Sequence, residues 1–224
     1  MNVRGTDKRP ALTRDFILET ALGIVDEHGI NGLTMRRLGT ELGTDPMMLY
    51  RHFPGKAAVL DGLMEVIWHG VQAPDPQGGD TGWREHLVRV MHALRESLLA
   101  HPRAIVIVGT RPATGPELFA LMERLLASLV SAGMSADAET ADLLNALVNY
   151  TVGHVLAEAG DPVGGDADPE SNQQVSPAHF PHLAAVFNSG WQYDPHRQYD
   201  RALRAFVGGW QGADTLAHGE GAGE

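Results

Sequence analysis

The chain has 224 residues, of which 43% are hydrophobic and 20% are charged, an ordinary composition for a soluble protein with one domain or two small ones. The absence of cysteine excludes disulfides, thiolate metal sites and a cysteine nucleophile, and the lack of a long apolar run or apolar leader predicts a cytoplasmic protein without membrane contact. Residues 1–60 carry eight Lys or Arg against seven acidic residues, a net charge of about +1, whereas residues 61–224 carry nine Arg against 21 acidic residues, a net charge of −12. This asymmetry indicates a neutral-to-basic module on an acidic body or chance variation.

Three helices are predicted near the N-terminus, in the arrangement of a helix-turn-helix. The side chains of Thr13, Thr34 and Asp45 are suited to cap the starts of these helices, because their oxygens can accept from free backbone amides. Gly29 should end the first helix, and Gly43 should make the turn between the second and the third. The expected ranges are 13–28, 35–42 and 46–53.

The third helix would lie in the major groove of DNA and present its first turn to the bases. Met47 and Met48 would then contact thymine methyl groups, while Leu49 and Phe53, four residues apart, would face the core. A core role for the methionines is the alternative. It would turn Leu49 and Phe53 outward.

Polar and basic side chains near these methionines complete the predicted DNA-binding surface. Arg36 and Arg51 are candidates for guanine, and Tyr50, His52 and Lys56 suit phosphate oxygens. The full predicted set of DNA contacts is Thr34, Met35, Arg36, Pro46, Met47, Met48, Tyr50, Arg51, His52 and Lys56.

The rest of the chain is also predicted to be helical, because apolar residues recur at helical spacing between Gly- and Pro-rich breaks. The fold class is therefore all-α. Helices are expected over 56–72, 83–100, 116–132, 137–159, 182–189 and 196–213, with a short apolar segment over 103–109. Residues 160–181 are expected to form a long mobile loop, and residues 218–224 a disordered tail.

Neither catalysis nor metal binding finds support in the sequence, which contains no nucleophile-elbow, P-loop, dinucleotide-binding or HExxH motif. We therefore expect no enzyme activity, no cofactor and no metal site, and we expect structural or solvent roles for most of the eleven histidines. His154 is the exception, because it lies near Asn149 and Tyr150 on an apolar helix. It would either orient a ligand or be a satisfied core histidine.

Residues 33–63 resemble the DNA-binding segment of the tetracycline-repressor (TetR) family. The matching positions are Leu33, Thr34, Arg36, Leu38, Leu42, Gly43, Leu49, Tyr50, His52, Phe53, Lys56 and Leu60. The sequence departs at Gly39, where the family usually has alanine. Residues 98–115, with the motif Gly109–Pro112, and residues 150–158 resemble parts of the family's C-terminal domain.

This resemblance implies an all-α homodimer that binds operator DNA and is released by a small molecule. The implied organisation is a helix-turn-helix domain over 10–57 and a ligand-binding and dimerisation domain over 58–217. Two-fold contact is expected from small and apolar side chains on the last long helices. These are Ala138, Ala141, Leu144, Val148, Leu203, Phe206, Val207, Gly208 and Trp210.

The effector is expected to be a largely apolar molecule that needs no metal. Ile107, Asn149 and Ala157 stand where the family's namesake holds magnesium, and none of them is a charged or imidazole ligand. The predicted ligand contacts are Met64, Trp68, Met91, Leu94, Thr110, Arg111, Met122, Asn149, Tyr150 and His154, and the apolar wall extends to Ile67, Ile105 and Phe187. Thr110 and Arg111 would end the helix that moves the 56–72 helix. A regulator without an effector, or one gated by a protein, is the alternative.

Overall fold

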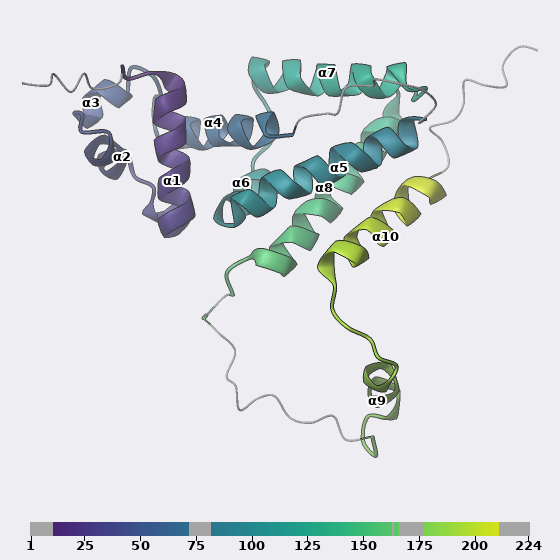
Figure 1. The fold of residues 1–224 in the computed structure, drawn as a ribbon. Coiled ribbons are helices and arrows are strands. Elements are labelled where there is room, and N and C mark those ends of the chain that lie inside the picture. Colours follow the sequence, from purple (N-terminus) through teal and green to yellow (C-terminus); the bar gives the residue numbers. More distant parts are fainter. Residues whose placement is uncertain (1–10, 72–81, 163, 166–176, 211–224) are drawn as a thin grey trace, which may run out of the picture.

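The computed structural model describes residues 11–71, 82–162, 164–165 and 177–210, and every regular element within these residues is helical, which confirms the all-α prediction (Figure 1). The elements are α1 (Arg14–Gly32), α2 (Met35–Glu41), α3 (Pro46–Leu49), α4 (Lys56–His69), α5 (Trp83–Ala100), the 3-10 helix η1 (Pro102–Ala104), α6 (Ile105–Thr110), α7 (Pro116–Ser131), α8 (Ala138–Ala159), α9 (Pro181–Asn188) and α10 (Pro195–Gly209). The predicted tail over 218–224 and most of the predicted loop over 160–181 lie outside the described residues.

Helices α1, α2 and α3 form the reading unit, and their starts are capped as predicted. The side chains of Thr13, Thr34 and Asp45 each accept a hydrogen bond from a backbone amide two or three residues further on. Gly43, in the turn between α2 and α3, has φ 60°, which a residue with a side chain adopts only with strain. The predicted helix-turn-helix is therefore built from the caps and the turn that its sequence specifies.

Two helix ends in the reading unit differ from the prediction. Gly29 breaks the regular geometry of α1 with φ 68°, as expected, but one further turn follows and α1 ends at Gly32. Helix α3 ends at Leu49 instead of Phe53, and Pro54 disfavours any continuation of the helix through Phe53. Tyr50 and its neighbours up to Phe53 therefore lie in a turn, with the Phe53 amide donating to the Leu49 carbonyl at 2.9 Å.

The remaining helices form a larger body, which we call the effector domain after the role that the family resemblance implies for it. Helices α5, α8 and α10 pack on one another, α7 lies across α4 and α5, and α9 extends away from the body (Figure 1). Buried apolar side chains form a single cluster that runs from α1 through α4 into α5, α8 and α10. The reading unit and the effector domain therefore share one hydrophobic core.

Candidate DNA-reading surface and effector domain

The outer face of the reading unit combines apolar and basic side chains. Met47 is 70% exposed and Met48 40% exposed, whereas Leu49 and Phe53 are buried. The methionines therefore point away from the core, as the DNA-binding interpretation requires. We call the exposed group the reading surface: Thr34, Arg36, Met47, Met48, Tyr50, Arg51 and His52.

The two candidate guanine-reading arginines are free to bind a partner. Among the described residues, the side chains of Arg36 and Arg51 have no hydrogen bond or ion pair, whereas nearby Arg37 lies 4.0 Å from Glu41. Unpaired guanidinium groups suit base edges and phosphates, because both present acceptor oxygens. The N-terminus of α3 between them is held by Asp45, whose carboxylate accepts from the Met47 amide at 2.8 Å.

Three predicted DNA contacts are only partly exposed. Met35 packs against the core, and Pro46 lies beside Gly39, where an added Cβ would come within 3.1 Å of the proline ring. Lys56 donates from Nζ to the Ile30 carbonyl at 2.7 Å, so it caps the last turn of α1. This ammonium group retains two donors that could reach a phosphate.

The predicted ligand contacts fall into two groups. Met64, Trp68, Met91 and Leu94 are buried together in the hydrophobic cluster. Met122 is 44% exposed on α7, Asn149 is exposed on α8, and Phe187 is 48% exposed on α9, so the structure does not bring these three into the same wall. The difference arises because helical spacing alone cannot tell which apolar face a neighbouring helix covers.

His154 is half-buried among aromatic rings of α8 and α10. Its Nε2 lies 3.0 Å from the Pro195 carbonyl oxygen, and its ring is 5.2 Å from that of Tyr199. Tyr150 stacks on the other side of this cluster, with its ring 5.5 Å from Tyr199 at an angle of 6°. These partners favour the interpretation of His154 as a satisfied structural histidine.

Thr110 and Arg111 close α6 and connect it to α4. The Thr110 hydroxyl donates to the Val106 carbonyl, and Arg111 lies just beyond the helix. The Arg111 guanidinium donates from Nε to Asp61 at 2.8 Å and from Nη2 to the Ala57 carbonyl at 3.2 Å. Arg111 therefore links the end of α6 to the first turns of α4, and whether α6 moves α4, as the sequence predicts, stays a prediction.

A buried ion pair joins α5 and α8 and is not among the features predicted from the sequence. Arg95 is 6% exposed, and its Nη2 lies 2.7 Å from both carboxylate oxygens of Glu158. The guanidinium also lies over the Tyr199 ring, whose hydroxyl contacts Thr151 and donates to a main-chain carbonyl of α5. Burial raises the pKa of Tyr199. The sequence does indicate that Arg95 is buried, because it falls on the apolar stripe of its helix, four residues after Met91.

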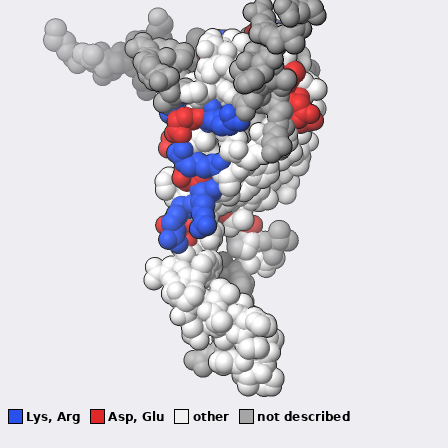
Figure 2. Space-filling model, turned by 90° about the vertical axis from the view of Figure 1, so that its right-hand side faces the viewer, with Lys and Arg blue, Asp and Glu red and all other residues white. Residues whose placement is uncertain are grey.

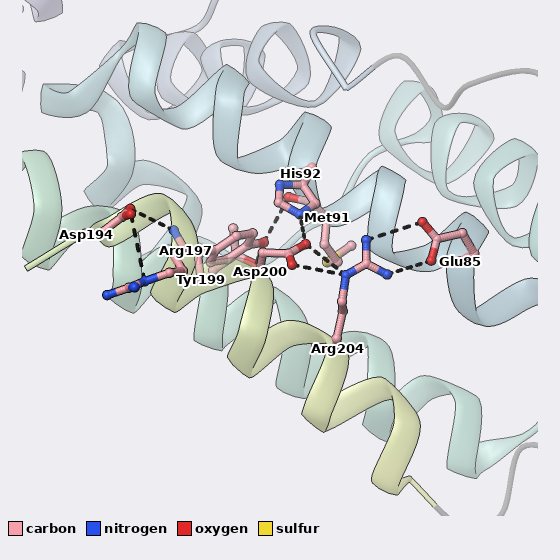
Figure 3. Close-up of polar contacts among 9 residues, drawn as sticks. Glu85, Met91, His92, Asp194, Arg197, Tyr199, Asp200 and Arg204 are labelled. Atoms are coloured by element: carbon pink, nitrogen blue, oxygen red, sulfur yellow. Dashed lines mark hydrogen bonds and ion pairs between the residues drawn. The ribbon is translucent and has the colours of Figure 1, made fainter.

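A shallow polar pocket of about 360 Å³ lies between α5 and α10, on the outside of the effector domain. Arg204 is central to it and donates to both Asp200 and Glu85, with His92 3.0 Å from Asp200 on the other side (Figure 3). The hydrogen bond from Arg204 lowers the pKa of Glu85. Burial raises the pKa of Asp200, but hydrogen bonds from His92 and Arg204 outweigh it and leave this pKa below its ordinary value.

Glu85, His92, Asp200 and Arg204 form a network between α5 and α10, and we expect the stability that it contributes to be lost in acid. A carboxyl group with a lowered pKa in the folded state stabilises the fold above its unfolded pKa, and that contribution disappears as pH falls through the folded pKa. Replacing Arg204 with alanine should therefore make the free energy of unfolding fall less steeply as pH decreases below about 4.5, the region where free carboxyl groups titrate. Urea unfolding at a series of pH values would measure this, and equal slopes for wild type and Arg204→Ala would contradict it.

Four of the nine side chains predicted to form a two-fold interface are exposed on α8 and α10, Gly208 among them, while Leu144, Val148 and Trp210 are partly buried against the core. Ala138 and Ala141 are exposed, and Phe206 is 41% exposed. Leu203 and Val207 are an exception, because both are buried in the core of the protomer and are not available to a partner. The helix α10 turns them inward, against α5 and α8.

Helix α9 and its flanks form an uncharged, apolar projection. Residues 177–193 include no Asp, Glu, Lys or Arg, and Figure 2 shows this lower lobe without charged side chains, below a part of the same face where Arg and acidic residues gather. Its exposed apolar side chains are Phe180, Leu183, Val186, Phe187, Trp191 and Tyr193.

No helix in the described residues is long and apolar enough to cross a membrane. Within the same residues, His, Asp and Glu side chains form no group of three that could hold a metal ion.

Comparison with known proteins identifies relatives over nearly the whole chain. Residues 17–63 match the family model for bacterial regulatory proteins of the tetR family, and residues 75–209 match the model for the tetracyclin repressor-like C-terminal domain. An HTH-type transcriptional regulator of Saccharopolyspora erythraea is 32% identical over 90% of this chain and 85% of its own length. The class C tetracycline repressor of Escherichia coli is 31% identical over 88% of this chain and 90% of its own. The crystal structure of ActR from Streptomyces coelicolor in complex with actinorhodin covers 90% of this chain and 97% of its own, with 28% identity and a TM-score of 0.71.

Proposed function

The chain belongs to the tetR family of bacterial regulatory proteins, and we propose that this regulator represses transcription as a homodimer on a near-palindromic operator. The reading surface is the observation that carries the proposal. It places on one helix-turn-helix two exposed thioethers and two guanidinium groups that have no hydrogen bond or ion pair to any described residue. No packing role explains this exposure, whereas major-groove binding uses both chemical types.

Each part of the reading surface has a proposed task on DNA. Met47 and Met48 contact thymine methyl groups, and Arg36 and Arg51 read guanine. Tyr50, His52 and Lys56 bind phosphates, with Thr34, Met35 and Pro46 forming the edge of the contact. In this proposal Lys56 supports α1 and binds a phosphate at the same time, since its contact with the Ile30 carbonyl uses one of three donors.

A homodimer should select a near-palindromic sequence from random double-stranded DNA. One reading unit makes too few contacts for specific binding, and two related by a two-fold axis need inverted half-sites spaced by whole turns of DNA. Sequencing of bound DNA would give the half-site and its spacing, and light scattering should give a mass near twice 24.1 kDa. A monomeric mass at micromolar concentration, or a selected site without symmetry, would count against the proposal.

We propose that the releasing effector is a largely apolar small molecule that binds without metal. The positions that resemble the magnesium ligands of the family's namesake support this, because Ile107 is a buried aliphatic side chain and Ala157 an exposed methyl group. The methionine-rich cluster around Met64 and Met91 offers polarizable, adaptable side chains. The related ActR is itself bound to a small molecule, actinorhodin, in its crystal structure.

Release of operator DNA by such an effector should be unaffected by EDTA. Actinorhodin and a panel of apolar aromatic molecules can be screened by fluorescence anisotropy of labelled operator, with a tetracycline–magnesium mixture for comparison. Met91→Trp should lower the affinity for the active molecule at least tenfold, because the larger side chain fills the volume in which the molecule binds. If chelation abolishes release, or if Met91→Trp leaves effector affinity unchanged, the metal-free apolar site is wrong.

A regulator that needs no effector, or is gated by another protein, is the second candidate. The tight burial of Met64, Met91 and Leu94, each at most 2% exposed, favours it, because a solid core leaves no room for a ligand. In that case no molecule in the screen would change operator affinity, and Met91→Trp would destabilise the fold by overpacking.

A further inference from the structure

We propose that Arg103 is a positioning residue that fixes the orientation of the reading unit by joining the C-terminal ends of α1 and α8. The inference rests on the proposed function, because it concerns how the position of the effector domain reaches the DNA-binding surface. It adds a second connection to the one that Arg111 makes between α6 and α4.

Arg103 binds the end of α1 directly. It lies in η1, and its Nη1 donates to the carbonyl oxygens of Asp26 at 3.1 Å and Glu27 at 2.6 Å. These carbonyls belong to the last regular turn of α1 before the break at Gly29. Carbonyls at such an end lack partners within the helix and carry partial negative charge, so a guanidinium is a well-matched cap.

The same guanidinium also holds the end of α8. Its Nε donates to a carboxylate oxygen of Asp161 at 2.9 Å. Asp161 directly follows Gly160, the residue that terminates α8. Arg103 therefore spans two helix ends, one in the reading unit and one in the effector domain, that are far apart in the sequence.

A second contact joins the same segments. The Nδ1 of His101 lies 2.8 Å from one carboxylate oxygen of Asp26, and the other oxygen of Asp26 is buried without a partner. His101 precedes η1, so both contacts leave from one short stretch of chain. Together they fix α1 in direction as well as position, which a single contact could not do.

The end of α8 is able to transmit a displacement. Three residues before Asp161, Glu158 is held by Arg95 of α5, and Tyr150 and His154 lie on the preceding turns. A change in the packing of α8, from a ligand or from a partner protomer, therefore moves Asp161 and with it Arg103. Because α1 shares its core with α2 and α3, the reading surface turns with it.

Spin-label distances would test this without any ligand. The chain has no cysteine, so the pair Thr40→Cys on α2 and Glu123→Cys on α7 introduces its only thiols. Labelled protein diluted with unlabelled protein reports the distance within one chain. We expect one narrow distribution in this background and a broader or shifted one with Arg103→Ala. Operator affinity should fall about fivefold or more, as is typical of coupling between sites.

Variants distinguish a positioning role from a general loss of stability. Arg103→Lys should not restore the narrow distribution, because one ammonium cannot replace the planar fork that reaches three acceptors. Asp161→Asn, at an exposed position, should broaden it while the contacts to α1 remain. Arg197→Ala is the matched control, since this exposed arginine pairs, among the residues that the structure describes, only with Asp194, the N-cap of α10.

The inference is wrong if Arg103→Ala and Asp161→Asn both give the distance distribution of Arg197→Ala. Failure of the wild-type chain to select any operator would instead contradict the proposed function, and the distance measurement would still decide the role of Arg103.

Discussion

Replacing Glu158 with alanine is expected to lower the free energy of unfolding by about 3–5 kcal/mol. The change leaves the Arg95 guanidinium buried at 6% exposure without its carboxylate, and the Nε of this side chain already lacks a partner. A charge without a counterion in a low-dielectric interior costs far more than the net stabilisation that the intact pair provides. Urea unfolding at a fixed protein concentration would measure the loss.

A double variant separates this cost from the value of the pair itself. Arg95→Met combined with Glu158→Leu removes both charges and keeps similar volume, so its stability should be within about 1–2 kcal/mol of wild type or higher. The free energy of unfolding of Glu158→Gln should lie between those of Glu158→Ala and wild type, because a neutral amide still accepts a hydrogen bond. If Glu158→Ala costs less than about 1 kcal/mol, solvent reaches Arg95 and the buried-pair description is wrong.

Loss of the Arg36 guanidinium is expected to weaken operator binding about 30-fold to 20,000-fold. One bidentate contact to guanine contributes about 1–3 kcal/mol, and a homodimer loses it at both half-sites. Arg36→Ala should leave the free energy of unfolding nearly unchanged, because the side chain is exposed and makes no hydrogen bond or ion pair with another described residue. Titration of labelled operator, with point changes at each position, would show which base loses its preference.

Arg201→Ala provides the control for charge alone, since this exposed arginine lies on α10, far from the reading unit. It should change operator affinity by less than about twofold in the same buffer, in which salt screens distant charges. Arg36→Lys should recover nonspecific binding but not the base preference, because a lysine cannot form the bidentate contact. Equal losses for Arg36→Ala and Arg201→Ala would show that Arg36 does not read the operator.

The reading unit could be predicted closely because its determinants are local. Thr34 and Asp45 cap the helices that follow them, and Leu49 and Phe53 are buried while Met47 and Met48 are not. A cap, a turn glycine and a four-residue apolar spacing each act within a few residues, so the sequence alone specifies them.

The effector domain was less predictable because its site depends on which faces meet. Met122 and Phe187 fit an apolar pattern but lie on exposed faces, while Leu203 and Val207 were assigned to an interface and are core residues. The assignment of a helix face to the core, to a partner or to a ligand requires the packing of distant helices. The Arg95–Glu158 pair shows the same limit, since nothing local in either helix identifies the other as its partner.

The contact between α1 and η1 has a consequence for synthesis of the chain. Helix α1 packs against α4 and Pro102–Ala104 as well as against α2, so part of its surface is covered by residues that lie outside the helix-turn-helix. On the ribosome, the stretch from the end of the helix-turn-helix to η1 takes about 2–10 s to emerge. During that interval the part of α1 that packs against η1 has no partner from its own chain, so we expect the DNA-binding segment to reach its final packing only after η1 has been synthesised.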